Sequence, residues 1–512
     1  MPVVATSLGG TTCEIERWRG LLILSTHTLS AISCRGLRWA ALAGVAAGSA
    51  AIWWMTFTRI MWLPAFYDVP HLDTPKLLGV TTGSMVRFAL AMGAESLLYL
   101  LAFWAVRPMQ TARSAAVVLL LAVPIALPLV LCYPGGAADV YAYIAEAISV
   151  VRYHANPFYV PVSAIPGHPL LPFLDYPNET THYGPLWLLI GVALRYLSGS
   201  NLLVNLLAFK VAAVLFLLAV AGLVYLTLRR TKPDAAVTAA LLVAWNPLLL
   251  VELAENAHND VAMMVFVALA FFLQSRGSRR GAIAALLTAC LVKYVAAVLV
   301  PLFLLVDLHQ AGPWRKWMLD AILDALAMLA FGSALTISLG FAGTIGILQK
   351  LSEWFTTSPS AVAYYWLRES MPLQEAAAII SNGGKAIFAL IYLGAVLRLW
   401  RRPATVTGSS LWTILALLVV GTSWFQPWYI TWAIPVAALV ATPVSYAVLI
   451  GMTLGGFLIH LIMGFAWRLD WNHESLIAIN AAGALGMWLP VLVAALGAYT
   501  LVRHRRGASP PR

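Results

Sequence analysis

The sequence predicts an all-α, polytopic membrane protein with about 13 transmembrane helices and several short re-entrant or interfacial helices. Of its 512 residues, 61% are hydrophobic and only 10% are charged, whereas soluble domains carry about 25% charged residues. The apolar residues recur in runs long enough to cross the roughly 30 Å of a bilayer core. Basic clusters flank several of these runs, as expected at cytoplasmic membrane borders. A soluble globular protein is therefore excluded.

The confident apolar segments follow one another along most of the chain. They are Leu37–Trp62, Phe88–Val106, Ser114–Leu131, Leu202–Leu228, Ala235–Leu253, Val261–Gln274, Trp317–Gly340, Lys385–Leu399, Leu411–Trp424, Tyr446–Phe465 and Ile477–Val502. The formal net charge of +11 lies mostly in basic clusters beside these segments, which we place on the cytoplasmic side. The charge therefore indicates an orientation in the cell membrane and no nucleic-acid partner.

This topology divides the chain into membrane and aqueous parts. Residues 1–36 are expected to be a retained cytosolic lead, because they lack the charge order and cleavage pattern of a signal peptide. The other parts are the N-terminal helices (37–133), an extracytoplasmic catalytic loop with interfacial helices (134–200), a core transmembrane bundle (201–341), a second extracytoplasmic loop (342–384), a C-terminal transmembrane bundle (385–502) and a basic cytosolic tail (503–512). The four scattered cysteines form no C-x-x-C pair and indicate neither a metal site nor a disulfide framework.

Three apolar segments do not have the length that their expected number of full crossings needs. Residues 282–307 lie between two basic clusters and must cross an even number of times, so we expect two short helices that meet near Lys293 and Tyr294. Such a break at depth is tolerated where it is buried in protein or lines a cavity. Gly184–Leu197 predicts a re-entrant or interfacial helix, and Trp428–Val440 predicts a short span.

Asp139 begins a segment with a helical pattern. From Asp139 to Tyr153 the apolar residues fall on one helical face, which predicts an amphipathic helix lying on the membrane. Asp139 could cap this helix or act as a catalytic base. The two roles are compatible, because a carboxylate at a helix N-terminus stays ionised.

Further ionisable residues lie at membrane depth, where each costs about 2.5–3.5 kcal/mol to insert and is a functional candidate by default. The run from Glu255 to Asp260 is polar at five of six positions, and its spacing does not suggest a metal site. Lys293 could snorkel to the interface or contact a phosphate. Glu95 is expected to pair with a polar group on a neighbouring helix. Asp320 and Asp324 are expected to be solvated or paired with Arg315 and Lys316.

Aromatic residues gather in clusters such as Trp424–Tyr429. An aromatic belt at the membrane interface explains most of them. An aromatic cluster that faces outward could also stack on a sugar ring.

Several short motifs, taken in order, resemble the GT-C superfamily of integral-membrane glycosyltransferases. They resemble in particular the actinobacterial polyprenol-phosphomannose-dependent α(1→6)-mannosyltransferases of lipomannan assembly. The motifs are Asp139-Val140-Tyr141-Ala142-Tyr143, Asn156-Pro157-Phe158, Tyr183-Gly184-Pro185-Leu186-Trp187, Trp245-Asn246-Pro247, His258-Asn259-Asp260, Val292-Lys293 with Pro301, and Trp424 to Tyr429. The resemblance covers about residues 115–465.

The resemblance implies GT-C-like extracytoplasmic loops and a multi-pass enzyme of the cell membrane. Such an enzyme takes a hexose, here mannose, from a polyprenyl-phosphate sugar and passes it to a lipid-linked glycan or another hydroxyl acceptor outside the cytoplasm. The matching base is Asp139, and a single Asp in place of paired acids weakens the case for a metal. No cofactor is expected beyond the donor substrate. The expected substrate-binding residues are His182, Tyr183, Glu255, His258, Asn259, Asp260, Lys293 and Trp428.

The residues support the same chemistry. A carboxylate base would deprotonate the acceptor hydroxyl, while cationic and hydrogen-bonding groups, among them Arg368, would hold the leaving phosphate. The expected product has an inverted anomeric configuration. The alternative is a transporter or flippase of the lipid-linked sugar, in which buried charges line a pathway.

Overall fold

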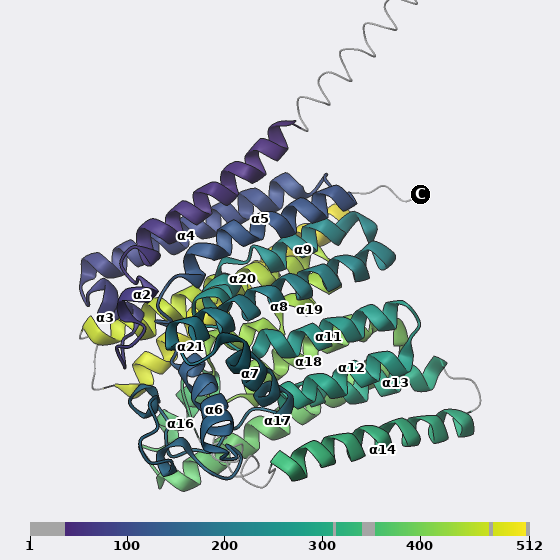
Figure 1. Ribbon diagram of the computed structural model, residues 1–512. Helices are drawn as coiled ribbons and strands as arrows, with labels where there is room; N and C mark the ends of the chain where they lie inside the picture. Colours follow the sequence, from purple (N-terminus) through teal and green to yellow (C-terminus); the bar gives the residue numbers. More distant parts are fainter. Residues whose placement is uncertain (1–35, 311–313, 340–353, 470–474, 508–512) are drawn as a thin grey trace, which may run out of the picture.

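The computed structural model describes residues 36–310, 314–339, 354–469 and 475–507, and over these residues the chain is built from helices. Figure 1 shows most of the long helices lying side by side in one bundle. The predicted all-α class is therefore confirmed for the described residues. The expected cytosolic lead and the last residues of the basic tail lie outside them.

Eight helices among the described residues are long and apolar enough to cross a membrane. They are Gly36–Thr58, α4 (Thr82–Val106), α5 (Ala112–Val130), α8 (Leu202–Thr231), α17 (Leu373–Arg401), Pro403–Gly421 with α18 (Val406–Ala416), Pro443–Phe465 with α20 (Pro443–Ile459), and α21 (Leu476–Gly507). A ninth span arises if α9 (Ala236–Ala244) and the helix from Pro247 to Glu255, bent against each other by 43°, count as one. The chain is a multi-pass membrane protein, and the count of about 13 crossings stays a prediction.

Shorter helices fill the places where the sequence predicts them. α7 (Pro185–Ser198) matches the expected short helix, and η9 (Pro427–Trp432) with α19 (Ile434–Val440) matches the expected short span. α12 (Arg279–Val292) ends at Lys293, whose backbone is extended, and a 3-10 turn leads into α13 (Val300–Gln310). Figure 1 shows α12 and α13 side by side. The predicted break at Lys293 is confirmed.

α6 (Asp139–Tyr153) corrects two expectations. Its apolar residues Val140 and Ile144 are buried, but so are polar residues of its other face such as Glu146 and Ser149. The helix is therefore enclosed by protein and does not lie free on a membrane. Asp139 is the first residue of the helix and makes no capping bond, and the N-cap position belongs to Ala138.

Two expectations about isolated acids have different outcomes. Ser49 donates to Glu95 at 2.6 Å, which confirms a polar partner on a neighbouring helix. On α14 (Trp314–Leu339), Asp320 and Asp324 both accept contacts from Arg280, at 2.8 and 3.1 Å. Both carboxylates stay partly exposed, as expected, but their partner Arg280 was not named in advance; it lies at the start of α12, which packs against α14.

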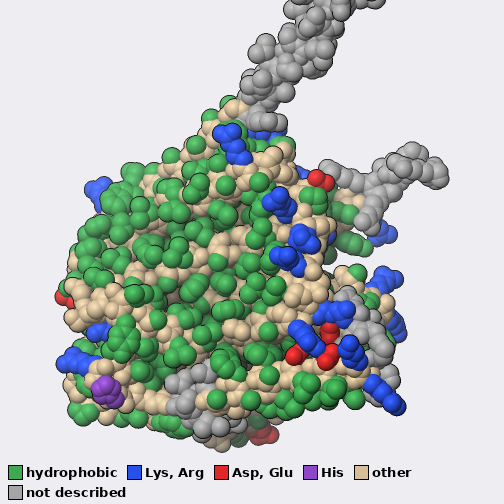
Figure 2. Space-filling model, turned by 45° about the vertical axis from the view of Figure 1, so that its right-hand side comes forward, with side chains coloured by type: hydrophobic (Ala, Val, Ile, Leu, Met, Phe, Trp, Pro, Cys, Tyr) green, Lys and Arg blue, Asp and Glu red, His purple; other side chains and the backbone are tan. Residues whose placement is uncertain are grey.

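The two ends of the bundle differ in charge. Figure 2 shows blue Lys and Arg side chains gathered along one edge of the molecule. α8 and α17 carry basic residues in their last turns, and α12 begins with Arg279 and Arg280. α6 and α7, by contrast, lie toward the opposite end of the bundle (Figure 1). We call the end that holds the last turns of α8 and α17 and the start of α12 the basic end.

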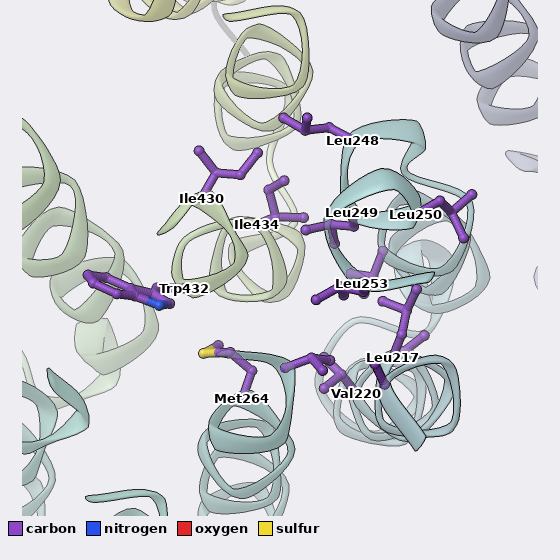
Figure 3. Close-up of a cluster of buried hydrophobic side chains, with 14 of the residues drawn as sticks. Leu217, Val220, Leu248, Leu249, Leu250, Leu253, Met264, Ile430, Trp432 and Ile434 are labelled. Atoms are coloured by element: carbon purple, nitrogen blue, oxygen red, sulfur yellow. The ribbon is translucent and has the colours of Figure 1, made fainter. Parts of the chain in front are cut away.

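An apolar cluster supports the centre of the bundle. Figure 3 shows leucines that follow the bend in the chain at Pro247 meeting α8, α11 (Asp260–Ser275) and η9. Leu249, Leu253 and Ile434 are fully buried, and Trp432 is 6% exposed. This packing fixes the relative positions of α11, η9 and the π-helix η5 (Val251–Glu255), the elements that carry the polar residues described next.

Candidate functional site

A close backbone contact positions the start of α6. The amide of Gly136 donates to the Asn256 side chain at 2.9 Å. A Cβ atom at Gly136 would overlap with the same side chain, so glycine is required for this approach. The contact joins the segment before Asp139 to the polar run that follows η5.

Three polar groups lie close to one carboxylate oxygen of Asp139. The hydroxyls of Tyr143 and Tyr183 donate to its Oδ2 at 3.4 and 3.2 Å. Nδ1 of His258 lies 3.5 Å from the same oxygen. The Asp139 side chain is still 30% exposed, so the carboxylate can meet a ligand.

His258 belongs to a row of four ionisable side chains. Its other ring nitrogen lies 3.4 Å from Glu252 Oε2, and Glu252 Oε1 lies 2.6 Å from Nε2 of His460. The row therefore runs Asp139, His258, Glu252, His460, and we call it the ionic row. His258 is fully buried and stacks on Trp428 with ring centroids 4.1 Å apart. Stacking and two carboxylates fix the orientation of the imidazole.

Lys293 presents a cation inside an aromatic cage. Its Nζ donates to Asp260 Oδ1 at 2.8 Å, and the indole of Trp432 donates to the same oxygen. The ammonium also lies within 6 Å of the ring centroids of Tyr183, Tyr429 and Trp432. The Lys293 side chain is 17% exposed and the Asp260 side chain 1%. The cation therefore faces outward from a buried carboxylate.

The start of α7 holds the Lys293 segment in place. The amide of Gly184 donates to the carbonyl of Val292 at 2.9 Å. A Cβ atom at Gly184 would overlap with the carbonyl of Leu291. This contact carries Tyr183, the residue before Gly184, to a position between Asp139 and Lys293.

These groups border a cavity of about 190 Å³, which we call the Lys293 cavity. Its lining combines charged or polar residues with a wall of aromatic rings. The lining residues are Asp139, Tyr176, Glu179, His182, Tyr183, Lys293, Tyr294, Val295, Trp354, Trp424, Trp428, Tyr429 and Trp432. A polar, cationic centre with aromatic walls can hold an anionic, sugar-bearing molecule.

The surroundings shift the pKa values of the site groups outside the spans. Burial alone would raise the pKa of Asp139, but the contact with His258 and the charges nearby lower it to about 2. Burial alone would lower the pKa of His258, but Asp139 and Glu252 raise it to about 9. Burial lowers the pKa of His182 to about 4 against the opposing effect of Asp139. At pH 7 the site therefore holds an Asp139 carboxylate, a His258 imidazolium and a neutral His182.

The structure brings most of the predicted site residues together. His182, Tyr183, Lys293 and Trp428 line the cavity with Asp139, and His258 and Asp260 lie directly behind them. Asn259 is buried, and its side-chain oxygen and nitrogen have no hydrogen-bond partner among the described residues. Its backbone amide lies 3.5 Å from the Tyr143 hydroxyl.

Glu255 and Arg368 lie elsewhere. Glu255 lines a separate cavity, described below. The reason is local, because Ala257 adopts a left-handed backbone with φ 57°, and this turn sends Glu255 and His258 in different directions. Arg368 packs against Tyr364 and Tyr365 and is absent from the lining of the Lys293 cavity.

Sequence reasoning missed several contributors. Tyr143 lies one helical turn after Asp139, and this spacing could have identified it. Glu252 lies three residues before the polar run from Glu255 to Asp260, but its role as the link between two histidines depends on His460, which is 208 residues away. An isolated His in an apolar span was the available signal for His460. Tyr429 belongs to the Trp424–Tyr429 cluster, which the sequence leaves open between an aromatic belt and a surface for stacking on a sugar, and Trp432 was not singled out. Within the described ranges, no group of three or more His, Cys, Asp and Glu side chains is placed to hold a metal ion.

Comparison with known proteins gives a family match. The model of the family "Alpha-(1->6)-mannopyranosyltransferase, N-terminal domain" matches residues 38–309. This range contains Asp139, the polar run around His258, and Lys293.

Individual relatives carry the same description. The chain is 25% identical to an alpha-(1->6)-mannopyranosyltransferase A of Corynebacterium glutamicum over 36% of this chain and 37% of the relative. It is 24% identical to an alpha-(1->6)-mannopyranosyltransferase A of Mycobacterium tuberculosis over 70% of this chain and 72% of the relative. It is 26% identical to a probable alpha-(1->6)-mannopyranosyltransferase of Mycolicibacterium smegmatis over 64% of this chain and 66% of the relative.

Proposed function

We propose that this chain, which belongs to the alpha-(1->6)-mannopyranosyltransferase family matched over residues 38–309, is a membrane mannosyltransferase that uses Asp139 as its base. The observation that carries the proposal is the placement of an ionised, partly exposed carboxylate and a caged ammonium around one cavity. The names of the relatives support mannose as the sugar and an α-(1→6) linkage.

The donor we propose is a polyprenyl-phosphate sugar. Lys293 keeps donors free beside the cavity because its contact with Asp260 uses one of the three N–H groups of the ammonium. An ammonium surrounded by aromatic rings suits a phosphate anion joined to a less polar body. The rings of Trp428, Tyr429 and Trp432 offer flat surfaces on which a sugar can pack.

The proposed reaction is a single displacement. Asp139 accepts the proton of an acceptor hydroxyl while the oxygen forms a bond to the anomeric carbon. The bond from that carbon to the phosphate oxygen breaks, and polyprenyl phosphate leaves as an anion that Lys293 stabilises. One displacement inverts the anomeric configuration. The negative charge of a bound donor raises the pKa of Asp139 and makes it a better base at the moment it is needed.

The distribution of charge supports an extracytoplasmic site. Lys and Arg are enriched in cytoplasmic loops of membrane proteins, and the basic end of the bundle carries such residues on α8, α12 and α17. The start of α6 lies away from that end (Figure 1). A lipid-linked glycan or another hydroxyl-bearing molecule outside the cytoplasm is the acceptor we propose.

The test is the substitution Asp139→Asn, which keeps the shape of the side chain and removes the base. With polyprenyl-phosphate mannose and an alkyl α-(1→6)-dimannoside, transfer should fall by about 10²–10⁴-fold. Asp234→Asn, at an exposed position in a turn at the basic end, is the matched control. Wild-type transfer by folded Asp139→Asn protein would contradict the assignment of the base.

A second assay separates an enzyme from a transporter of the same lipid. Proteoliposomes are loaded with labelled polyprenyl-phosphate mannose and supplied with the dimannoside. The proposal predicts a labelled trisaccharide product. Movement of the lipid across the bilayer without such a product would overturn it.

A further inference from the structure

A second cavity shares the lining residue Trp428 with the Lys293 cavity. It has a volume of about 260 Å³ and joins polar groups to an apolar wall, and we call it the Arg468 cavity. Its polar lining includes Asp73, Glu255, Gln426, His460 and Arg468. Its apolar lining comes from membrane-spanning helices and includes Phe57, Phe88, Met92 and Phe457. An amphiphilic ligand with a polar head fits such a lining.

The charges of the Arg468 cavity do not suit a phosphate. Both terminal nitrogens of Arg468 donate to the two oxygens of Asp73, at 2.8 and 2.7 Å. Arg468 and its other neighbours lower the pKa of Asp73 against the effect of burial, so this carboxylate stays ionised. Glu255 adds a second carboxyl group to the lining. Arg468 thus uses both terminal nitrogens in a two-pronged pair with Asp73, whereas Lys293 gives one N–H to Asp260 and keeps two for a ligand.

The same groups suit an uncharged sugar. Carboxylates accept hydrogen bonds from hydroxyl groups, and an amide both accepts and donates them, without the cost of pairing a second charge. Trp428 adds a ring on which a sugar can stack. Thr356 and Thr357 complete the polar side of the lining, and hydrogen bonds between Thr356 and the residues Ser423 and Phe425 tie this strip to the segment before Trp428.

Two features connect this cavity to Asp139. Trp428 lines both cavities, so the two cavities share this residue as part of their walls. The ionic row begins at Asp139 beside the Lys293 cavity and ends at His460 in the lining of the Arg468 cavity. The Arg468 cavity is thus built into the same network as the base.

We propose that the Arg468 cavity binds the uncharged sugar units of the acceptor glycan and directs its terminal hydroxyl past Trp428 to Asp139. This inference rests on the proposed function, because it names the substrate for which the second cavity is shaped. The cavity assigns Arg468, Asp73 and Gln426 to acceptor binding, and of these only Gln426 lies in a motif noted in the sequence, Trp424 to Tyr429.

Steady-state kinetics with two substrates test the assignment. Gln426→Ala and Arg468→Gln should each raise the KM for the alkyl α-(1→6)-dimannoside about tenfold or more, which corresponds to one hydrogen bond to a charged or polar group. The KM for polyprenyl-phosphate mannose should stay within about twofold of wild type. Lys293→Gln is the control with the reverse pattern: it should raise the KM for the donor and leave the KM for the dimannoside unchanged.

Binding without turnover keeps the two proposals distinguishable. Saturation-transfer NMR on the purified full chain should detect the dimannoside with wild-type protein and lose the signal with Gln426→Ala. Gln426→Ala removes no ion pair, so it tests the cavity even if Arg468→Gln unfolds the chain. A raised donor KM with an unchanged dimannoside KM in Gln426→Ala would overturn the inference in favour of a donor-lipid cavity. Absence of transfer by wild-type protein that still binds dimannoside would instead overturn the proposed function.

Discussion

The buried imidazole of His258 determines how Asp139 is charged. It lies between two carboxylates, at 3.5 Å from Asp139 and 3.4 Å from Glu252. Each carboxylate favours the protonated ring, and the ring in turn favours both anions. The pKa of about 9 for His258 and of about 2 for Asp139 are two expressions of the same contact.

The pH dependence of transfer follows from this pair. Both groups keep their charges between about pH 2 and pH 9. We expect transfer to decline as the pH rises through about 9, because His258 then loses the positive charge that, together with Lys293, offsets the negative charge of the donor phosphate beside Asp139. The same group contributes folding stability that is complete below its unfolded pKa of about 6.5 and is lost as the pH rises through 9. Rate and thermal-unfolding profiles from pH 6 to pH 10 measure both effects.

Glu252→Gln tests whether the ionic row sets this profile. The change removes one of the two anions that hold the proton on His258, so the alkaline limb should move to lower pH by about one unit or more. Glu95→Gln, whose carboxylate accepts from Ser49 away from the site, serves as the control and should leave the profile in place. An unshifted limb in Glu252→Gln would show that Glu252 is only a packing residue.

At the scale of single elements, the break between α12 and α13 creates the position of Lys293. Residues 282–307 are too few for two full crossings, and this arithmetic with the flanking charges predicted the break from sequence. The enclosure of α6 could not be predicted in the same way. An amphipathic pattern distinguishes apolar from polar positions, but it does not show that Glu146 and Ser149 face protein and not water.

Gly184→Ala should disturb the break between α12 and α13 without changing a charged side chain. The added methyl group would overlap with the carbonyl of Leu291 and push α7 away from the end of α12. We expect a loss of about 1–3 kcal/mol in unfolding free energy and a raised donor KM as Lys293 shifts. Gly222→Ala, in α8 with open space around its Cβ position, is the matched control and should be neutral or stabilising. Equal stability and equal donor KM in the two variants would contradict this role of Gly184.

At the scale of the whole molecule, the arrangement combines parts of the chain that lie far apart in sequence. Composition and charge placement predicted a multi-pass helical bundle, and the polar stretches at Asp139, His258 and Lys293 were recognisable because ionisable residues are rare in apolar sequence. The partnership of Glu252 with His460 and that of Asp73 with Arg468 were not predictable. They join residues 208 and 395 positions apart, and only the packing of α3 (Thr74–Leu78), α20 and the helices around them brings these pairs together.

The orientation in the membrane is a property of the whole chain and can be tested by labelling. Tyr159→Cys introduces a thiol at a position that is 56% exposed, in the loop after α6. Arg401→Cys does the same at the basic end of α17. In intact cells a membrane-impermeant maleimide should label the first variant alone, and both variants after permeabilisation. The native cysteines give the background, measured on wild type, and labelling of Arg401→Cys in intact cells would reverse the proposed orientation.

Burial also determines which parts of the site respond to ionic strength. Dissolved ions screen exposed charges effectively and buried ones much less. His258 and Glu252 are fully buried, while the Asp73 and Arg468 side chains are 24% and 33% exposed. Added salt should therefore weaken the arginine pair much more than the buried contact between His258 and Glu252. Potassium chloride would then act as a selective probe, altering how the acceptor is held and leaving the alkaline limb of the rate profile where it was.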